Sequence, residues 1–497
     1  MAVVENYVEG PDLEKLALEP APELNPSVPV KLAYSFGQAI ESGYLIVAGF
    51  VFFYYTAVLG LSGSAVGVAL AISMCVDAVM DPLIGSISDN VRSKWGRRLP
   101  LMLLGAPATG LAVWMLFAPP AMLSPFLLFG WLVASKLLLR GFASVYNLPY
   151  AALGAEMASG YVERASVAAY RGVFGIVISL VITAVAMTGF FAGGAGLQNG
   201  AAYPAFGAAI GLLLFACAAL AMVGVWRYAV RLPQPRTQPA PMFLGLFREL
   251  PEVFRNKSFR ALFLTALLFW VAAGVNGALN NHAYVFVWKI PPERIQFISY
   301  SYFLSMFLGI PLARLLLARF EKNTIIIQGL ILVLLAMTVL HSLRALGLFA
   351  PTGAEAQPWL MTSAGVAGIG IGLIIVALPA MMADAADEHE LLFGHRREGL
   401  YFAGLGFAGK AAAGLGQMAA GFALDALHFP KTAGVGAAVE IPEHVQRLLI
   451  LAWGPLAAFF GLLGLLALLP YGVTRARHAE IAAALKIKRA EEAAAAE

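Results

Sequence analysis

The chain contains 497 residues, of which 60% are hydrophobic and 12% are charged, and its mean hydropathy is +0.78. Soluble globular proteins are about 45–50% apolar and about 25% charged, so this composition excludes a water-soluble protein, a disordered protein and a nucleic-acid-binding protein. The formal net charge is only +4, and the two cysteines, Cys75 and Cys217, both lie in apolar runs. The cysteines therefore predict neither a disulfide framework nor a metal-ligand cluster.

Apolar blocks long enough to cross a bilayer follow one another along the chain. A membrane-spanning helix needs about 20 mostly apolar residues. The sequence predicts an all-α membrane protein with twelve transmembrane helices. The first 30 residues are acidic and proline-rich, unlike a cleavable signal peptide. The twelve blocks cover residues 33–59, 66–88, 100–118, 125–151, 168–192, 203–228, 259–287, 296–317, 323–346, 359–384, 398–427 and 446–470.

The blocks form two similar halves. Pro82 and Pro311 lie 229 positions apart, in blocks two and eight, and Pro149 and Pro379 lie 230 positions apart, in blocks four and ten. Prolines also recur in membrane helices for other reasons, but the two offsets agree. Six spans followed by six is the plan of the major-facilitator transporters, two bundles related by a pseudo-twofold axis along the membrane normal. The expected parts are an N-terminal tail (1–30), an N-terminal six-helix bundle (31–228), a linker (229–258), a C-terminal six-helix bundle (259–470) and a C-terminal tail (471–497).

The placement of basic residues predicts the orientation, because cytoplasmic connections carry an excess of Lys and Arg. The connections after blocks two, six, eight and ten and the C-terminal tail are basic. The opposite connections hold only Lys289, Arg294 and Lys431. We therefore expect both termini to be cytoplasmic, in a multi-pass protein of the cell (inner) membrane.

Two carboxylates in helix two, Asp77 and Asp81, are the most informative charges inside the membrane. They lie four residues apart and therefore on one helix face. Two ionised carboxylates at this spacing repel each other, so the pair favours a bound cation or a shared proton. The alternative is that basic side chains of neighbouring helices neutralise both acids and hold the bundle together.

Helix four carries a polar stripe within an arc of about 80°. Its two cations have no acid on the same helix, which favours a substrate with an anionic group. The alternative is salt bridges to carboxylates of helices one and two. The stripe contains Lys136, Arg140, Ser144, Asn147 and Ala151.

Further polar groups lie in other spans. Glu41 lies in helix one, Arg171 at the start of helix five and Asp384 at the cytoplasmic end of helix ten. Lys410 lies in the middle of helix eleven and needs a counter-charge, for which helix two is the natural source. In helix seven, two asparagines four apart, Asn276 and Asn280, form either a hydrogen-bonding face or contacts between helices.

The loop after helix two predicts a gate. Asp89, Arg97 and Arg98 lie at the cytoplasmic surface. We expect them to pair with helix ends of the other half and to hold the inner gate shut. Ordinary positive-inside charge is the alternative.

Several segments together follow the pattern of a known family. They are 31–37, 76–85, 88–100, 147–157, 163–164 with 170–171, 384–387, and 394–399 with Lys410. They resemble the glycoside–pentoside–hexuronide:cation symporters, the melibiose-permease-like branch of the major facilitators, over residues 31–470. The resemblance implies cotransport of a sugar with a proton or sodium, with no other cofactor and no resident metal.

The resemblance also implies roles for individual residues. The cation-binding residues are Asp77, Asp81, Ser144 and Asn147, and Lys410 lies beside the carboxylates, with Asp384 as a further charge-pairing residue. The resemblance places the sugar site at Glu41, Ser42, Asn147 and Arg171, and the basic stripe of helix four adds Lys136 and Arg140 as substrate-binding candidates.

Departures from the family pattern refine these expectations. Met80 stands where the sodium-using permeases have an asparagine, and Asn147 stands where they have an aspartate. The thioether of Met80 is a poor ligand for a hard cation such as sodium. These two departures favour proton coupling. Ser42 replaces a sugar-binding aspartate and Ala151 a stacking tryptophan, which argues against a galactoside. The basic stripe of helix four favours an acidic sugar such as a uronide; a lysophospholipid is the alternative.

The predicted function is secondary transport by alternating access. We expect a monomer in the lipid bilayer that carries a small-molecule substrate from one side to the other. The sequence lacks the Gly-x-Gly-Asp and His-Glu-x-x-His motifs of intramembrane enzymes. We therefore expect a transporter, neither an enzyme nor a sensor.

Overall fold

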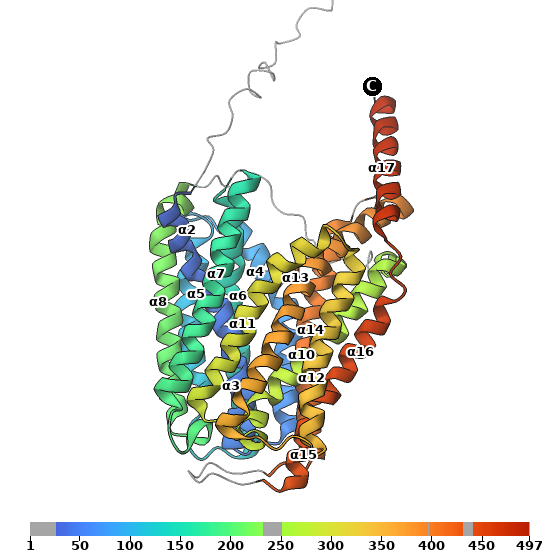
Figure 1. Cartoon of the computed structure of the whole chain (residues 1–497). Helices are drawn as coiled ribbons and strands as arrows, with labels where there is room; N and C mark the ends of the chain where they lie inside the picture. The colour runs from blue at the N-terminus through green and yellow to red at the C-terminus, as the bar shows by residue number, and fades with distance from the viewer. Residues whose placement is uncertain (1–25, 159, 232–250, 396, 431–440, 497) are drawn as a thin grey trace, which may run out of the picture.

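The computed structural model describes residues 26–158, 160–231, 251–395, 397–430 and 441–496, and these residues form helices and no strand (Figure 1). In this described part, eleven helices are long and apolar enough to cross a membrane. A further helix, α14 (Glu398–Ala426), has 29 residues. It is less apolar, because it is rich in glycine and carries Lys410. It packs between α10 and α4 and, as span eleven in chain order, brings the number of spans to twelve.

The N-terminal bundle contains spans one to six. The first span is broken into short segments, whereas most later spans are continuous helices. The elements are α2 (Val28–Ser35), η1 (Phe36–Gln38), α3 (Ala39–Phe53), η2 (Tyr54–Val58), α4 (Gly63–Asn90), α5 (Leu99–Phe117), α6 (Pro125–Glu156), α7 (Tyr161–Ala184), η3 (Val185–Phe190), η4 (Gly196–Gln198) and α8 (Ala202–Arg231).

The C-terminal bundle contains spans seven to twelve and ends in an additional helix, α17, that packs on α13. Most of the linker between the bundles lies outside the described residues. The elements are α10 (Lys257–His282), η5 (Ala283–Val287), α11 (Pro292–Leu317), α12 (Lys322–Ala345), η6 (Gly353–Glu355), α13 (Gln357–Phe393), α14, α15 (Glu443–Leu451), η7 (Ala452–Leu456), α16 (Ala457–Leu468) and α17 (Arg475–Ala496).

The two bundles share an irregular feature at equivalent positions. The first span of each bundle ends in a π-helical turn, η2 in one bundle and η5 in the other. The two turns lie 229 positions apart, the same separation as Pro82 of α4 and Pro311 of α11. Because π turns are rare, this agreement supports an internal duplication of six spans.

The bundles are joined at one end of the molecule. We call this the distal end (residues 59–62, 191–201, 288–291 and 427–430) and the other the basic end (residues 91–98, 157–160, 318–321 and 469–474). At the distal end, Asn281 Nδ2 donates to the carbonyl of Gly49 at 2.9 Å, and Thr56 Oγ1 lies 2.8 Å from His282 Nε2. Figure 1 shows the bundles meeting at the end away from the C-terminus. Ion pairs at the basic end, such as Lys31–Glu163 and Lys322–Asp384, stay within one bundle.

Glycines bring α4 and α14 together across the two bundles. A Cβ atom at Gly63 would lie 2.5 Å from the carbonyl oxygen of Gly421, and one at Gly67 would lie 2.8 Å from the Cα of Met418. Small residues let membrane helices approach closely in this way. The contact places the middle of α14, which holds Lys410, beside the middle of α4, which holds Asp77 and Asp81.

The carboxylate of Asp425 caps the beginning of α4 from the other bundle. Its two oxygens accept hydrogen bonds from the backbone N–H groups of Gly63 and Ser64, at 2.8 and 2.9 Å. A carboxylate at a helix N-terminus satisfies unpaired N–H groups and interacts favourably with the helix dipole. This interaction stabilises the closed distal end.

We expect Asp425→Ala to destabilise the protein by about 1–2 kcal/mol, the usual cost of losing an N-cap. The measurement is the thermal unfolding midpoint in detergent. Glu443→Ala, which removes an exposed acid from the first turn of α15, serves as the control and leaves the midpoint unchanged. Equal midpoints for the two variants would contradict the role of Asp425.

Candidate ion-coupling and substrate site

Four charged side chains from three helices meet in the middle of the fold. Arg140 of α6 donates a hydrogen bond to Oδ2 of Asp77 at 2.6 Å. Lys410 of α14 lies 3.1 Å from the same oxygen and also donates to Oδ2 of Asp81. Ser144 Oγ donates to Oδ1 of Asp77 at 3.3 Å. The site therefore combines two acids of one bundle with one base from each bundle.

The neutralisation of both acids by basic side chains, left open by the sequence, is what the structure shows. The predicted counter-charge for Lys410 on helix two is confirmed. Its ammonium contacts one oxygen of each carboxylate, the position that a bound cation would occupy. The side chain of Asp77 is fully buried, whereas 36% of the Lys410 side chain is exposed. A competing ion therefore reaches the site most directly on the Lys410 side.

The basic stripe of α6 packs on Tyr44 of α3. The Nζ atom of Lys136 lies 4.3 Å from the centre of the Tyr44 ring, and the guanidinium of Arg140 lies 4.8 Å from it. Lys136 is fully buried, and its Nζ has no hydrogen-bond partner among the described residues. In this conformation the stripe faces α3 and α4, and Arg140 is already paired with a carboxylate.

Glu41 and Asn147 form a separate polar pair. Asn147 Nδ2 donates to Oε2 of Glu41 at 2.6 Å, so Asn147 lies against helix one and has no bond to the two aspartates here. Ser42 is buried where α3 meets α7, because a Cβ at Gly175 would lie 3.1 Å from its hydroxyl. The guanidinium of Arg171 lies 5.9 Å from the ring centre of Tyr150.

A cavity of about 340 Å³ lies between the bundles on the distal side of Glu41. Its lining includes Leu45 and Gly49, which follow Glu41 by one and two turns on the same face of α3. The C-terminal bundle contributes Asn280, His341 and Trp453. The cavity therefore lies between the bundles, with an apolar wall and a few polar groups, as small-molecule sites do.

Both asparagines of helix seven, Asn276 and Asn280, line the cavity, and Asn276 also bonds to a neighbouring helix. Asn276 Nδ2 donates to the carbonyl of Trp453, and Trp453 Nε1 donates to the carbonyl of Asn276, both at 3.1 Å. Asn276 therefore joins two helices, as the second alternative predicted. Trp453 and His341 of the cavity lining were missed by the sequence reasoning; an isolated histidine within the apolar run of helix nine was the available signal.

The predicted pairing of the gate residues across the bundles is wrong for this conformation. Arg98 is 2.6 Å from Asp89 and, together with Arg97, 2.7 Å from Glu156, all within the N-terminal bundle. Burial lowers the pKa of Arg98, but the carboxylates of Glu156 and Asp89 outweigh it and the pKa is raised. The cluster therefore joins the ends of α4 and α6 to the beginning of α5, all within one bundle.

Asp384 lies far from the central charges. Both its oxygens accept hydrogen bonds from Lys322, at 2.8 and 2.6 Å, and His478 of α17 lies 3.5 Å away. Asp384 therefore forms its ion pairs with residues of α12 and α17, and not with Lys410.

The family of MFS/sugar transport proteins matches residues 34–475. The chain belongs to this family. The resemblance to the glycoside–pentoside–hexuronide:cation symporters is thereby confirmed, and the chain is a transporter and not an enzyme.

Named relatives and a solved structure agree. An uncharacterized symporter of Synechocystis is 28% identical over 91% of this chain and 95% of its own. The isoprimeverose transporter of Lactiplantibacillus pentosus is 21% identical, over 80% of each chain. The glucuronide carrier protein homolog of Escherichia coli is 24% identical over 79% and 82%. A bacterial homologue of the human lysosomal transporter Spinster has the same fold, with a TM-score of 0.61, 13% identity and coverage of 90% and 98%.

We expect Asp77→Asn to destabilise the protein more than Arg140→Met. Removing one partner of a buried ion pair costs about 3–5 kcal/mol. Without Arg140, Asp77 keeps Lys410 at 3.1 Å, whereas among the described residues Arg140 forms an ion pair with Asp77 alone. Unfolding midpoints in detergent test this order, with Asp387→Asn at the basic end as the control. Equal losses would show that Lys410 does not compensate Asp77.

Proposed function

We propose that this protein is a cation-coupled symporter that carries a sugar or an acidic sugar derivative by alternating access. The observation that carries the proposal is the bridging of two aspartates of one bundle by a lysine of the other. The relatives named for symport, isoprimeverose and glucuronide support the substrate class. None of these relatives is named for a lysophospholipid, and that alternative is not favoured.

Lys410 couples the ion to the movement of the bundles. While its ammonium bridges Asp77 and Asp81, the middle of α14 is held against α4. Protonation of a carboxylate, or a cation between the two, removes the attraction for Lys410 and loosens this contact. Only the exchange of one positive charge for another keeps the buried acids neutralised, so the ion and the conformational change are linked.

Proton coupling fits the residues around the carboxylates better than sodium coupling. The oxygens available are those of Asp77, Asp81 and Ser144, and two of them already contact Lys410. Met80, next to Asp81, offers only a thioether. A sodium ion requires several oxygen ligands, whereas a proton requires one carboxylate.

The substrate occupies the space between the Glu41–Asn147 pair and the cavity. The amide of Asn280 and the ring of Trp453 lie on the opposite wall, and a sugar ring offers hydroxyl groups to the first and an apolar face to the second. Arg171 is the cation best suited to a substrate carboxylate. It is half-buried, and the described residues show no ion pair for it, whereas Arg140 is paired with Asp77 and Lys136 is enclosed.

The basic end faces the cytoplasm of the cell, in the inner membrane, with both termini on that side. Its arginine-rich connections follow the positive-inside rule. The cross-bundle bonds Asn281–Gly49 and Asp425–Gly63 lie at the distal end. The conformation is therefore the one that opens to the cytoplasm and is closed to the outside.

We expect Asp77→Asn, Asp81→Asn and Lys410→Met to abolish ion-driven accumulation of a sugar in proteoliposomes, because the ion can no longer release α14 from α4. An imposed pH gradient drives accumulation by the unaltered protein, and a sodium gradient does not. Asp387→Asn is the control and accumulates normally. Counterflow exchange, which needs no coupling, shows that each variant is folded. Accumulation by Asp77→Asn at the level of Asp387→Asn would refute the coupling site.

We expect Arg171→Gln to raise the KM for a uronide roughly 10- to 150-fold while leaving that for the neutral glycoside nearly unchanged, because a hydrogen bond to a charged group contributes about 1.5–3 kcal/mol. Counterflow with both substrates measures the two KM values. Arg314→Gln, an exposed position on α11, is the matched control. If Lys136→Met lost the uronide preference and Arg171→Gln kept it, the substrate carboxylate would bind Lys136, and its assignment to Arg171 would be wrong.

A further inference from the structure

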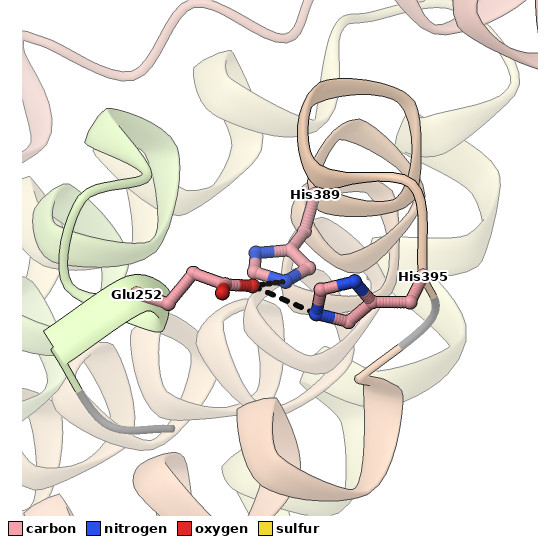
Figure 2. Close-up of side chains that lie close together, drawn as sticks. All are labelled: Glu252, His389 and His395. Carbon is pink, nitrogen blue, oxygen red and sulfur yellow. Dashed lines mark ion pairs between the residues drawn. The ribbon is translucent and has the colours of Figure 1, made fainter. Parts of the chain in front are cut away.

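Two histidines and one glutamate gather at the basic end, away from the ion-coupling site. Glu252 lies in a helical segment (251–253) just before α10, His389 near the end of α13, and His395 just after it (Figure 2). The Oε1 atom of Glu252 is 2.7 Å from Nε2 of His395 and 3.3 Å from Nε2 of His389. One ligand atom from each residue lies within 4.8 Å of the other two. Figure 2 shows the three side chains pointing toward one another.

The backbone brings the two histidines together. α13 ends at Gly394, which has φ of +86° and whose N–H donates to the carbonyl of Glu390. A residue with a side chain rarely adopts this left-handed conformation, whereas glycine does so readily. The turn reverses the chain directly after α13 and returns His395 to His389, so that their ring centres are 5.6 Å apart.

His389 is the side chain that hydrogen bonding leaves unexplained. It is fully buried; its Nδ1 has no hydrogen-bond partner among the described residues, and its Nε2 has only the contact with Glu252 Oε1 at 3.3 Å. The ring of Tyr401, 5.5 Å away, encloses it, and the Tyr401 hydroxyl also lacks a partner in this part of the chain. Buried polar groups without partners are costly and uncommon. A ligand that accepts the lone pair of His389 Nε2 removes this cost.

We propose that Glu252, His389 and His395 bind a divalent transition-metal ion of the zinc class. Two imidazoles and one carboxylate are a ligand set that Zn²⁺ uses, with water in the fourth position. With metal–ligand bonds of about 2.0–2.2 Å, tetrahedral ligand atoms lie about 3.3–3.5 Å apart. The distance of 3.3 Å from Glu252 to His389 already matches. The distance of 2.7 Å from Glu252 to His395 is shorter and would lengthen by movement of His395, whose side chain is 41% exposed.

The ion would hold the segment that precedes α10 against the connection between α13 and α14. The first segment is the end of the linker, and the second belongs to the C-terminal bundle. The ion therefore fixes the end of the linker on that bundle. The proposal is independent of the transported substrate and of the coupling ion, because the site contains none of the residues assigned to either.

The test uses the purified full-length protein in detergent, stripped of metal and carrying an affinity tag without histidine. We expect calorimetric titration with Zn²⁺ to show one tight site per chain, and Co²⁺ to give the visible absorption of tetrahedral coordination. Bound Zn²⁺ also raises the unfolding midpoint, because it binds the folded state alone. His395→Gln and Glu252→Gln weaken Zn²⁺ binding at least tenfold, since each removes a ligand.

His444→Gln is the matched control, because His444 is exposed on α15 at the distal end; this variant binds Zn²⁺ as the unaltered protein does. Both ligand variants replace partly exposed side chains, and we expect them to elute as monodisperse protein like the unaltered chain. Weaker Zn²⁺ binding by these variants then reflects the lost ligand and not unfolding. The proposal is overturned if the unaltered protein takes up no Zn²⁺ at micromolar concentrations. It is equally overturned if His395→Gln and Glu252→Gln bind Zn²⁺ as tightly as His444→Gln.

Discussion

The contact of Lys410 with Asp77 and Asp81 is the interaction on which the rest of the structure depends. It is made between bundles, in the middle of the fold, by groups whose charges are costly to leave alone in a membrane. The glycines of α4 and α14 permit it, since larger residues at Gly63 and Gly67 would separate the helices. Arg140 and Tyr44 then complete the enclosure from within the N-terminal bundle. The network contains two acids and two bases, so each buried charge has a partner of opposite sign.

The central charges form two sets of contacts, one within the N-terminal bundle and one between the two bundles. The buried pair Asp77–Arg140 is made within one bundle, whereas the partly exposed contact with Lys410 is made between bundles. A change of conformation that moves the bundles must break the second and can leave the first intact. The Glu41–Asn147 pair lies beside these charges, because Glu41 and Asn147 lie on α3 and α6, the helices that also carry Tyr44 and Arg140.

Much of the architecture could be predicted from the sequence, because it depends on apolar length and on the recurrence of prolines. The blocks coincide with the spans, and the counter-charge of Lys410 lies on the helix where it was expected. The partners of Asp89, Arg97 and Arg98 could not be predicted, since they depend on which end of the molecule is open. Nor could the meeting of Glu252 with His389, 137 positions along the chain, because a side-chain cluster made by a linker has no local pattern. The roles of the site residues stay predictions.

The π-helical turns at the ends of spans one and seven have an evolutionary consequence. A turn with one extra residue rotates everything beyond it by about 100° relative to a regular helix. Two such turns at matching positions, 229 residues apart, are most simply inherited from a single ancestral bundle that already contained the insertion. The two bundles nevertheless differ at the central charges, because Asp77 and Asp81 lie in one copy and Lys410 in the other.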